Sequence, residues 1–265
     1  MIGTQRSHPV ALRVTWAAPM NLRLFRIFLT AFAGTVAAAP VAAQDASLPA
    51  VTAPKKGPDG SRCELHVWPI DEYTTDMWGA LSAIPLVGFS LDQGSTKNRR
   101  QAIQSLMREY LSPEIQIDLL RKQGGANALG LIGYEIIVEE AFPSREALKE
   151  SKELREKRKK RFALLKAGKR LTDSQSSCYA ELGITTVAYR DIPQLKSNMF
   201  IGWSYRYYGA SPTLQSEIVL NSGGVPDGSL NFFPPTTEVD VERARNEVQY
   251  QFTKGFLGFA RNVRR

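Results

Sequence analysis

The chain has 265 residues, 43% of them hydrophobic, which is enough to bury the core of one domain. Its formal net charge is +8, and residues 144–170 alone hold twelve basic and four acidic residues, so the positive charge belongs to one segment. Only one of the two histidines, His66, lies in the expected mature chain, which excludes metal sites that need two histidine ligands.

Residues 1–43 predict an export signal, because they contain four arginines and no acidic residue. Met20, the expected translation start, opens a short basic stretch. An apolar run of 13 residues follows over 27–39, and small residues precede an expected cleavage after Ala43. A membrane-spanning helix needs about 20 apolar residues, so cleavage is favoured over an uncleaved anchor, and no transmembrane span is expected in the mature chain.

Residues 44–60 are rich in Ala, Pro and Gly, and we expect them to form a flexible leader. Residues 61–265 are expected to form a single α+β domain. Its sheet should be mixed or antiparallel, with helices packed mainly on one face.

The first strand of this domain is expected over 63–68, because apolar residues alternate there, beginning with Cys63. The second cysteine, Cys178, begins another alternating stretch. In an oxidising compartment such a pair favours a disulfide, and two buried free thiols are the alternative. Residues 77–91 carry no charge and should form a short helix and an apolar loop on the core, or else rest on a membrane surface.

Three elements are expected next. An apolar stripe at helical spacing predicts a helix over 96–111, and Ser112 followed by Pro113 predicts the start of another, which ends at Gly124. Alternation over 132–139 predicts a second strand.

The most distinctive element is a basic helix expected over 144–167, with Ser144 as its N-cap. It has few apolar positions and a continuous run of cations, namely Lys157, Arg158, Lys159, Lys160 and Arg161. These residues could bind an anionic membrane surface or an acidic partner, and a solvated helix with salt bridges along its surface is the alternative. Nucleic-acid binding is not expected, because the protein is exported and no aromatic residues interleave the cations.

Two alternating stretches, 178–188 and 199–207, predict a pair of antiparallel strands at the centre of the sheet. In the first, the face expected to be apolar consists of Cys178, Ala180, Leu182, Ile184 and Ala188. In the second it consists of Met199, Ile201, Trp203, Tyr205 and Tyr207. The opposite side chains Phe200, Arg206 and Tyr208 should face outward, as interface anchors or as ordinary cross-strand pairs. The last two expected elements of the domain are a strand over 215–220 and a helix that begins at Thr237.

The sequence contains no local catalytic motif, and we assign no catalytic residue, metal or cofactor. His66 is expected to be a solvated or structural strand residue. The acid pairs Asp71–Glu72 and Glu139–Glu140 fit ordinary turns. The glycine-rich stretch 124–133 precedes a strand, whereas a phosphate-binding loop lies between a strand and a helix N-terminus.

The order of these elements, with Leu65-His66-Val67-Trp68-Pro69 as the first strand and 178–208 as the central pair, resembles the small α/β domain of Tol-system and curli-assembly envelope proteins. The resemblance covers 63–262 and implies a non-enzymatic envelope role through protein contacts. Unlike the lipoproteins among these envelope proteins, the chain has no cysteine at the expected cleavage point to which a lipid could be attached.

These observations predict a periplasmic or secreted accessory or adaptor protein of the cell envelope, which acts through contacts with an envelope protein or an anionic membrane surface. The alternative is a periplasmic hydrolase whose acidic residues converge in a cleft.

Overall fold

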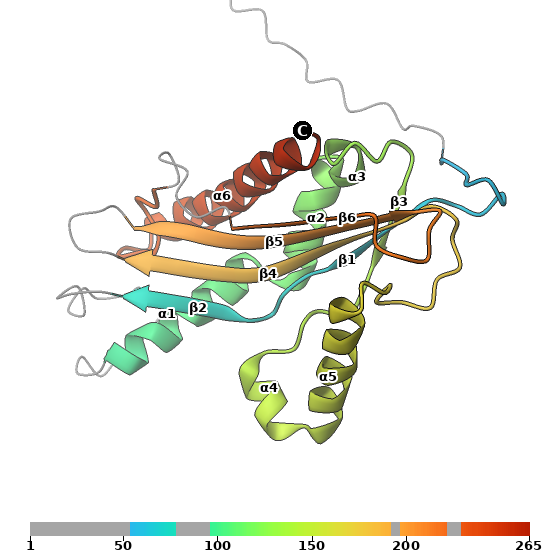
Figure 1. Ribbon diagram of the computed structural model, residues 1–265. Helices are drawn as coiled ribbons and strands as arrows, with labels where there is room; N and C mark the ends of the chain where they lie inside the picture. The colour runs from blue at the N-terminus through green and yellow to red at the C-terminus, as the bar shows by residue number, and fades with distance from the viewer. Residues whose placement is uncertain (1–53, 78–95, 192–196, 222–228) are drawn as a thin grey trace, which may run out of the picture. The chain divides into compact units, whose positions relative to one another are not determined.

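A mixed sheet forms the centre of the computed structural model, which describes residues 54–77, 96–191, 197–221 and 229–265. Its order is β3-β1-β4-β5-β6, and β2 also pairs with β4 (Figure 1). The strands are β1 (Glu64–Trp68), β2 (Tyr73–Met77), β3 (Glu135–Val138), β4 (Tyr179–Asp191), β5 (Asn198–Gly209) and β6 (Ser216–Asn221). Strands β1 and β2 pair with β4 in parallel, whereas β4, β5 and β6 are antiparallel neighbours. The expected α+β class, with a mixed sheet, is confirmed.

The strands β1 and β2 follow one another along the same edge of β4, with a break between them. Residue Trp68 is paired with Gly183, and Tyr73 with Val187. Between these pairs the chain leaves β4, and Ile70 instead bridges to Phe142. A proline at position 69 cannot donate a ladder hydrogen bond, which favours a break at this point.

Strand β4 bulges where its neighbour is interrupted. Ile184 lies opposite Trp203 and Thr186 opposite Gly202, so Thr185 is an extra residue. The bulge exchanges the two faces of the strand. Val187 and Tyr189 therefore join the core, and the expectation that Ala188 continues the apolar face is wrong.

The helices of the described chain are α1 (Thr96–Tyr110), α2 (Pro113–Lys122), α3 (Gly125–Ala128), α4 (Arg145–Glu150), α5 (Lys152–Lys166) and α6 (Asp240–Val263). The core lies between one face of the sheet and α1, α2 and α6 (Figure 1). Trp203 of β5 is fully buried there, with its ring centroid 5.3 Å from that of Phe252 and 5.6 Å from that of Phe256. These residues confirm the predicted last helix and the predicted core face of β5.

A buried glutamine holds the break between β1 and β2 against the helices. Gln116 of α2 accepts a hydrogen bond from the Ile70 amide at 3.0 Å and donates to the Ile70 carbonyl at 2.8 Å. Tyr73 donates to the carbonyl of Leu111, which lies between α1 and α2. Backbone groups that leave a sheet need such partners when they are buried, so the break is a fixed feature of the fold.

The predicted single helix over 144–167 is two helices. Residue Ser151 is extended (φ −112°, ψ 118°), and its hydroxyl accepts a hydrogen bond from the Leu154 amide at 3.2 Å, which makes it the N-cap of α5. Ser144 caps α4 in the same way, through the Ala147 amide. The chain therefore turns between two short helices, which form a hairpin directed away from α1, α2 and α6 (Figure 1).

Residues 54–60, the described part of the expected leader, fold back onto the domain. The Lys55 amide donates to the Gly133 carbonyl at 2.7 Å, and the Lys55 carbonyl accepts from the Cys63 amide at 3.0 Å. The predicted export signal over 1–43, the remainder of the expected leader, the apolar segment from residue 78 onward, and residues 192–196 and 222–228 lie outside the described residues. No helix in the described part of the chain has the length and apolar character that a membrane crossing requires.

Candidate functional site

The second face of the sheet, opposite the core, carries a buried polar network. Arg206 of β5 and Glu181 of β4 form an ion pair at 2.8 Å, and both side chains are only 2% exposed. Glu181 also accepts hydrogen bonds from the Leu171 amide and from the Tyr179 hydroxyl, at 2.7 and 2.8 Å. Burial raises the pKa of Glu181, while the Leu171 amide and then Arg206 act to lower that pKa. Burial and this neighbouring carboxylate raise the pKa of Tyr179.

The segment that leads from α5 into β4 covers this network. The Lys169 carbonyl accepts hydrogen bonds from the Tyr208 hydroxyl at 2.8 Å and from Arg206 at 3.2 Å. The guanidinium of Arg170 lies 4.6 Å from the centre of the Tyr179 ring. The prediction that Arg206 and Tyr208 face outward as interface anchors is therefore wrong, because the chain itself buries both of them. Phe200 is half-buried beneath the guanidinium of Arg190, which lies 4.1 Å from its ring.

His66 links two carboxylates on the same face. Its Nδ1 lies 2.6 Å from Glu139 after β3, and its Nε2 lies 2.9 Å from Glu64 of β1. Ser174 donates to Glu64 rather than to the histidine. A catalytic serine needs a histidine nitrogen that can take its proton, and both nitrogens of His66 are already engaged. The arrangement fits a structural role, because the His66 side chain is buried rather than solvated.

The hairpin of α4 and α5, here called the arm and defined as residues 145–166, carries the cations predicted to bind an anionic surface. Helix α5 has no buried residue, and Lys157, Arg158, Lys159 and Lys160 are exposed. Arg161 is half-buried, and its guanidinium lies 4.8 Å from the centre of the Phe142 ring. Burial lowers the pKa of Arg161, although Glu140 and Glu139 act to raise that pKa.

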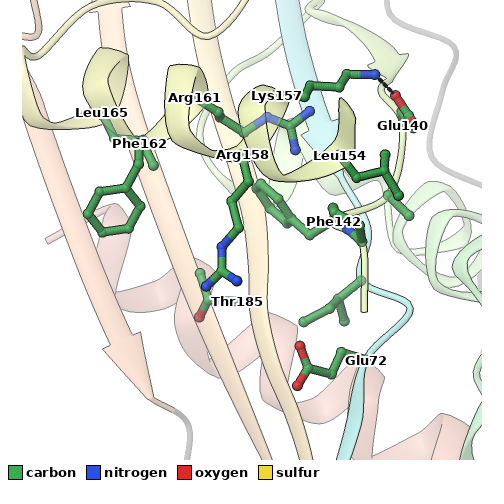
Figure 2. Close-up of a pocket in the computed structure, with 13 residues that line it drawn as sticks. Glu72, Glu140, Phe142, Leu154, Lys157, Arg158, Arg161, Phe162, Leu165 and Thr185 are labelled. Atoms are coloured by element: carbon green, nitrogen blue, oxygen red, sulfur yellow. Dashed lines mark hydrogen bonds and ion pairs between the residues drawn. The ribbon is translucent and has the colours of Figure 1, made fainter. Parts of the chain in front are cut away.

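A cavity of about 250 Å³ lies between α5 and the second face of the sheet, at the break between β1 and β2 (Figure 2). It is lined by Ile70, Glu72, Glu140, Ala141, Phe142, Pro143, Leu154, Lys157, Arg158, Arg161, Phe162, Leu165 and the bulge residue Thr185. Most of these side chains are apolar, and the charged ones come mainly from α5. The fold brings them together because the strand break and the bulge of β4 meet beneath the helix.

The two carboxylates that line this cavity are already paired. Glu72 binds Arg145 of α4 at 2.8 Å, and Glu140 accepts a hydrogen bond from Lys157 (Figure 2). Arg158 forms no ion pair with any described residue, and its side chain extends across the cavity toward Thr185 in Figure 2. The cavity thus combines an apolar lining with a cation that has no carboxylate partner in the described chain.

A second, more open hollow of about 770 Å³ lies on the arm itself. It is lined by Arg145, Leu148, Lys149, Arg155, Arg158, Lys159 and Phe162, without an acidic residue. Arg155 closes the hairpin by donating to the carbonyls of Leu148 and Lys149, at 2.9 and 2.8 Å. Arg158 and Phe162 are shared by both hollows.

The expected disulfide is present. Cys63 and Cys178 are bonded, with their Cα atoms 4.7 Å apart, and the bond joins the start of β1 to the start of β4. Such bonds are typical of proteins that fold outside the cytoplasm. Within the described residues no cluster of three or more His, Cys, Asp or Glu side chains is arranged to hold a metal ion.

Comparison with models of protein families and with curated proteins finds no match to this chain. The site is therefore interpreted from its own residues. The sequence identified the basic run but not the cavity, whose lining comes from four separate segments of the chain. The local signals are Pro69, which precedes the first of these segments, and Pro143, which ends the second.

Proposed function

We propose that this protein is an exported, non-enzymatic accessory protein of the cell envelope, which acts in the periplasm by attaching to anionic membrane surfaces through the arm. The observation that carries this proposal is the exposure of the cations of α5 around Phe162, whose side chain is itself 65% exposed. Exposed cations attract anionic lipid head groups, and an exposed aromatic side chain can enter the head-group region.

The distribution of charge supports this role. Residues 144–170 carry a net charge of +8, the same as the whole chain. Each lysine or arginine near an anionic bilayer contributes about 1 kcal/mol to binding. Several cations on one exposed helix are therefore sufficient for reversible attachment, without any lipid anchor. The attraction is screened over roughly 10 Å at 0.1 M salt, so binding should depend strongly on ionic strength.

The alternative of a hydrolase with converging acidic residues has less support. The carboxylates at the cavity, Glu72 and Glu140, are each paired with a cation and line it together with basic residues. A glycosidase-type pair instead needs one carboxyl group free to donate a proton and another free to act as a base or nucleophile.

Vesicle flotation tests the proposal. We expect the oxidised protein to bind vesicles that contain phosphatidylglycerol at 50 mM salt, and to bind at least tenfold more weakly at 300 mM salt. The variant K149Q/K152Q/K159Q/K160Q removes four exposed cations from the arm and should lose binding.

The matched control is K97Q/R100Q/R121Q/K122Q, which removes four exposed cations from α1 and α2 and should leave binding nearly unchanged. Equal binding to neutral phosphatidylcholine vesicles would contradict the proposal. An equal loss in both variants would do so too, because the effect would then follow net charge rather than the arm. Neither set of residues lines the cavity beneath α5.

A further inference from the structure

The cavity beneath α5 has the two chemical parts of a binding site for an amphiphile. Its apolar part is formed by Ile70, Ala141, Phe142, Pro143, Leu154 and Leu165. The Phe142 ring packs close to Gly183 of β4, and the Arg161 guanidinium lies 4.8 Å from the centre of that ring. Ligand sites are commonly mostly apolar, with a few charged groups that fix the orientation of the ligand.

The charged part of the cavity favours an anion. Glu72 and Glu140 form their ion pairs with Arg145 and Lys157, and not with Arg158 or Arg161. Arg158 has no ion pair in the described chain, and Arg161 contacts the face of an aromatic ring. A guanidinium binds carboxylate and phosphate oxygens in a bidentate manner. Burial lowers the pKa of Arg161, so a bound anion would offset the cost of its partial desolvation.

The size of the cavity favours a small ligand. Its volume is about 250 Å³, whereas an engineered protein cavity of roughly 150 Å³ already binds benzene. One short alkyl chain therefore fits, but not the two long chains of a bilayer phospholipid.

We propose that this cavity is a binding site for a free, single-chain anionic amphiphile, with its alkyl chain among the apolar residues and its acidic head group at Arg158 and Arg161. This role goes beyond attachment to a membrane surface, because it uses the inner side of α5 rather than the outer lysines of the arm. The two proposals can fail independently.

Isothermal titration calorimetry with soluble probes tests the site. Octyl phosphate carries both parts of the ligand, octanol carries the chain alone, and inorganic phosphate carries the head group alone. We expect octyl phosphate, below its micellar concentration, to bind one site at least tenfold more tightly than either of the others. Butyl phosphate should bind more weakly than hexyl phosphate, by about fourfold for each CH₂ group that is lost.

Two variants locate the site. Thr185→Phe fills the cavity from the bulge of β4 and should abolish binding of octyl phosphate. Arg158→Gln removes the cation that has no carboxylate partner in the described chain. This variant should bind octyl phosphate at least tenfold more weakly than the wild type, and should bind octanol as the wild type does. Lys159→Gln is the matched control, because it removes the same charge from the adjacent residue, which does not line this cavity.

Several outcomes would overturn the proposal. If octyl phosphate binds no more tightly than inorganic phosphate, the cavity does not bind an alkyl chain. Equal weakening by R158Q and K159Q would show that the attraction is not local. Binding only to anionic vesicles, with no binding of monomeric octyl phosphate, would assign the arm to membranes alone. Because R158Q changes an exposed side chain, its folding can be verified by circular dichroism, and the test does not depend on T185F.

Discussion

Arg206 is a charged side chain in the interior of the protein, and its surroundings explain how it is tolerated. Its guanidinium pairs with Glu181, donates to the Lys169 carbonyl and lies 5.3 Å from the centre of the Tyr208 ring. The alternation of β5 placed Arg206 correctly on the face opposite the core. It could not show that a segment from elsewhere in the chain covers that face, because strand periodicity describes which side a residue is on and not what lies above it.

We expect the substitution Arg206→Met to lower the free energy of unfolding by about 3–5 kcal/mol at pH 7, because it leaves Glu181 buried without its counter-charge. Urea denaturation followed by tryptophan fluorescence measures this difference. The double variant R206M/E181L should recover much of the loss, since replacing a whole buried pair by apolar residues is often nearly neutral.

The loss in R206M should also depend on pH. Burial raises the pKa of Glu181, and Arg206 is one of the groups that lower it, so removing Arg206 raises the folded-state pKa further above the unfolded value. A carboxyl group with a raised folded-state pKa loses stability as the pH rises through that value. The deficit of R206M relative to the wild type should therefore be largest at pH 7 and smaller at about pH 4, near the ordinary pKa of glutamate. An equal deficit at both pH values would contradict this reasoning.

At the scale of single elements, the sequence predicted α1 and the central strands from one apolar face at the correct period, and α2 from its N-cap Ser112 followed by Pro113. The arm was predicted as one helix because strong helix formers surround Ser151, and their propensities hid the serine that interrupts them. The bulge at Thr185 left no local signal, since the residue is extended like its neighbours. Such features are set by pairing with other strands, which no local pattern contains.

Helix α5 should open far more readily than α6. Helix α5 has no buried residue, whereas α6 buries seven, and local stability follows buried contacts. In hydrogen-exchange mass spectrometry the amides of α5 should exchange many times faster than those of α6. The substitution Ser151→Ala removes the N-cap, at a cost of about 1 kcal/mol. It should make α5 exchange roughly fivefold faster, while α6 is unchanged. Slower exchange in S151A would mean that α4 and α5 fuse when the cap is removed.

At the scale of the whole molecule, the candidate site depends on how distant segments meet. The sequence singled out the cations of α5, but could not show that Arg158 and Arg161 line the cavity while Lys159 and Lys160 do not. Helix α5 was expected to have few core positions, so its apolar residues did not indicate which side of the helix faces the sheet. The sheet determines it, because the break between β1 and β2 opens the space that the inner side of α5 covers.

The disulfide should contribute more to the stability of the whole domain than any other single bond. It joins residues 115 positions apart, and in the chain-entropy model closing a loop of this length stabilises the folded state by about 4–5 kcal/mol. It also fixes β1 beside β4, where the Glu64 amide donates to the Cys178 carbonyl at 2.9 Å. We expect urea denaturation to show that the free energy of unfolding of the variant C63A/C178A is about 4–5 kcal/mol lower than that of the oxidised wild type. Dithiothreitol should lower the free energy of unfolding of the wild type to that of the variant, and should leave that of the variant unchanged. A variant within 1 kcal/mol of the oxidised wild type would contradict the entropic argument, since the sheet alone would then hold β1 and β4 together.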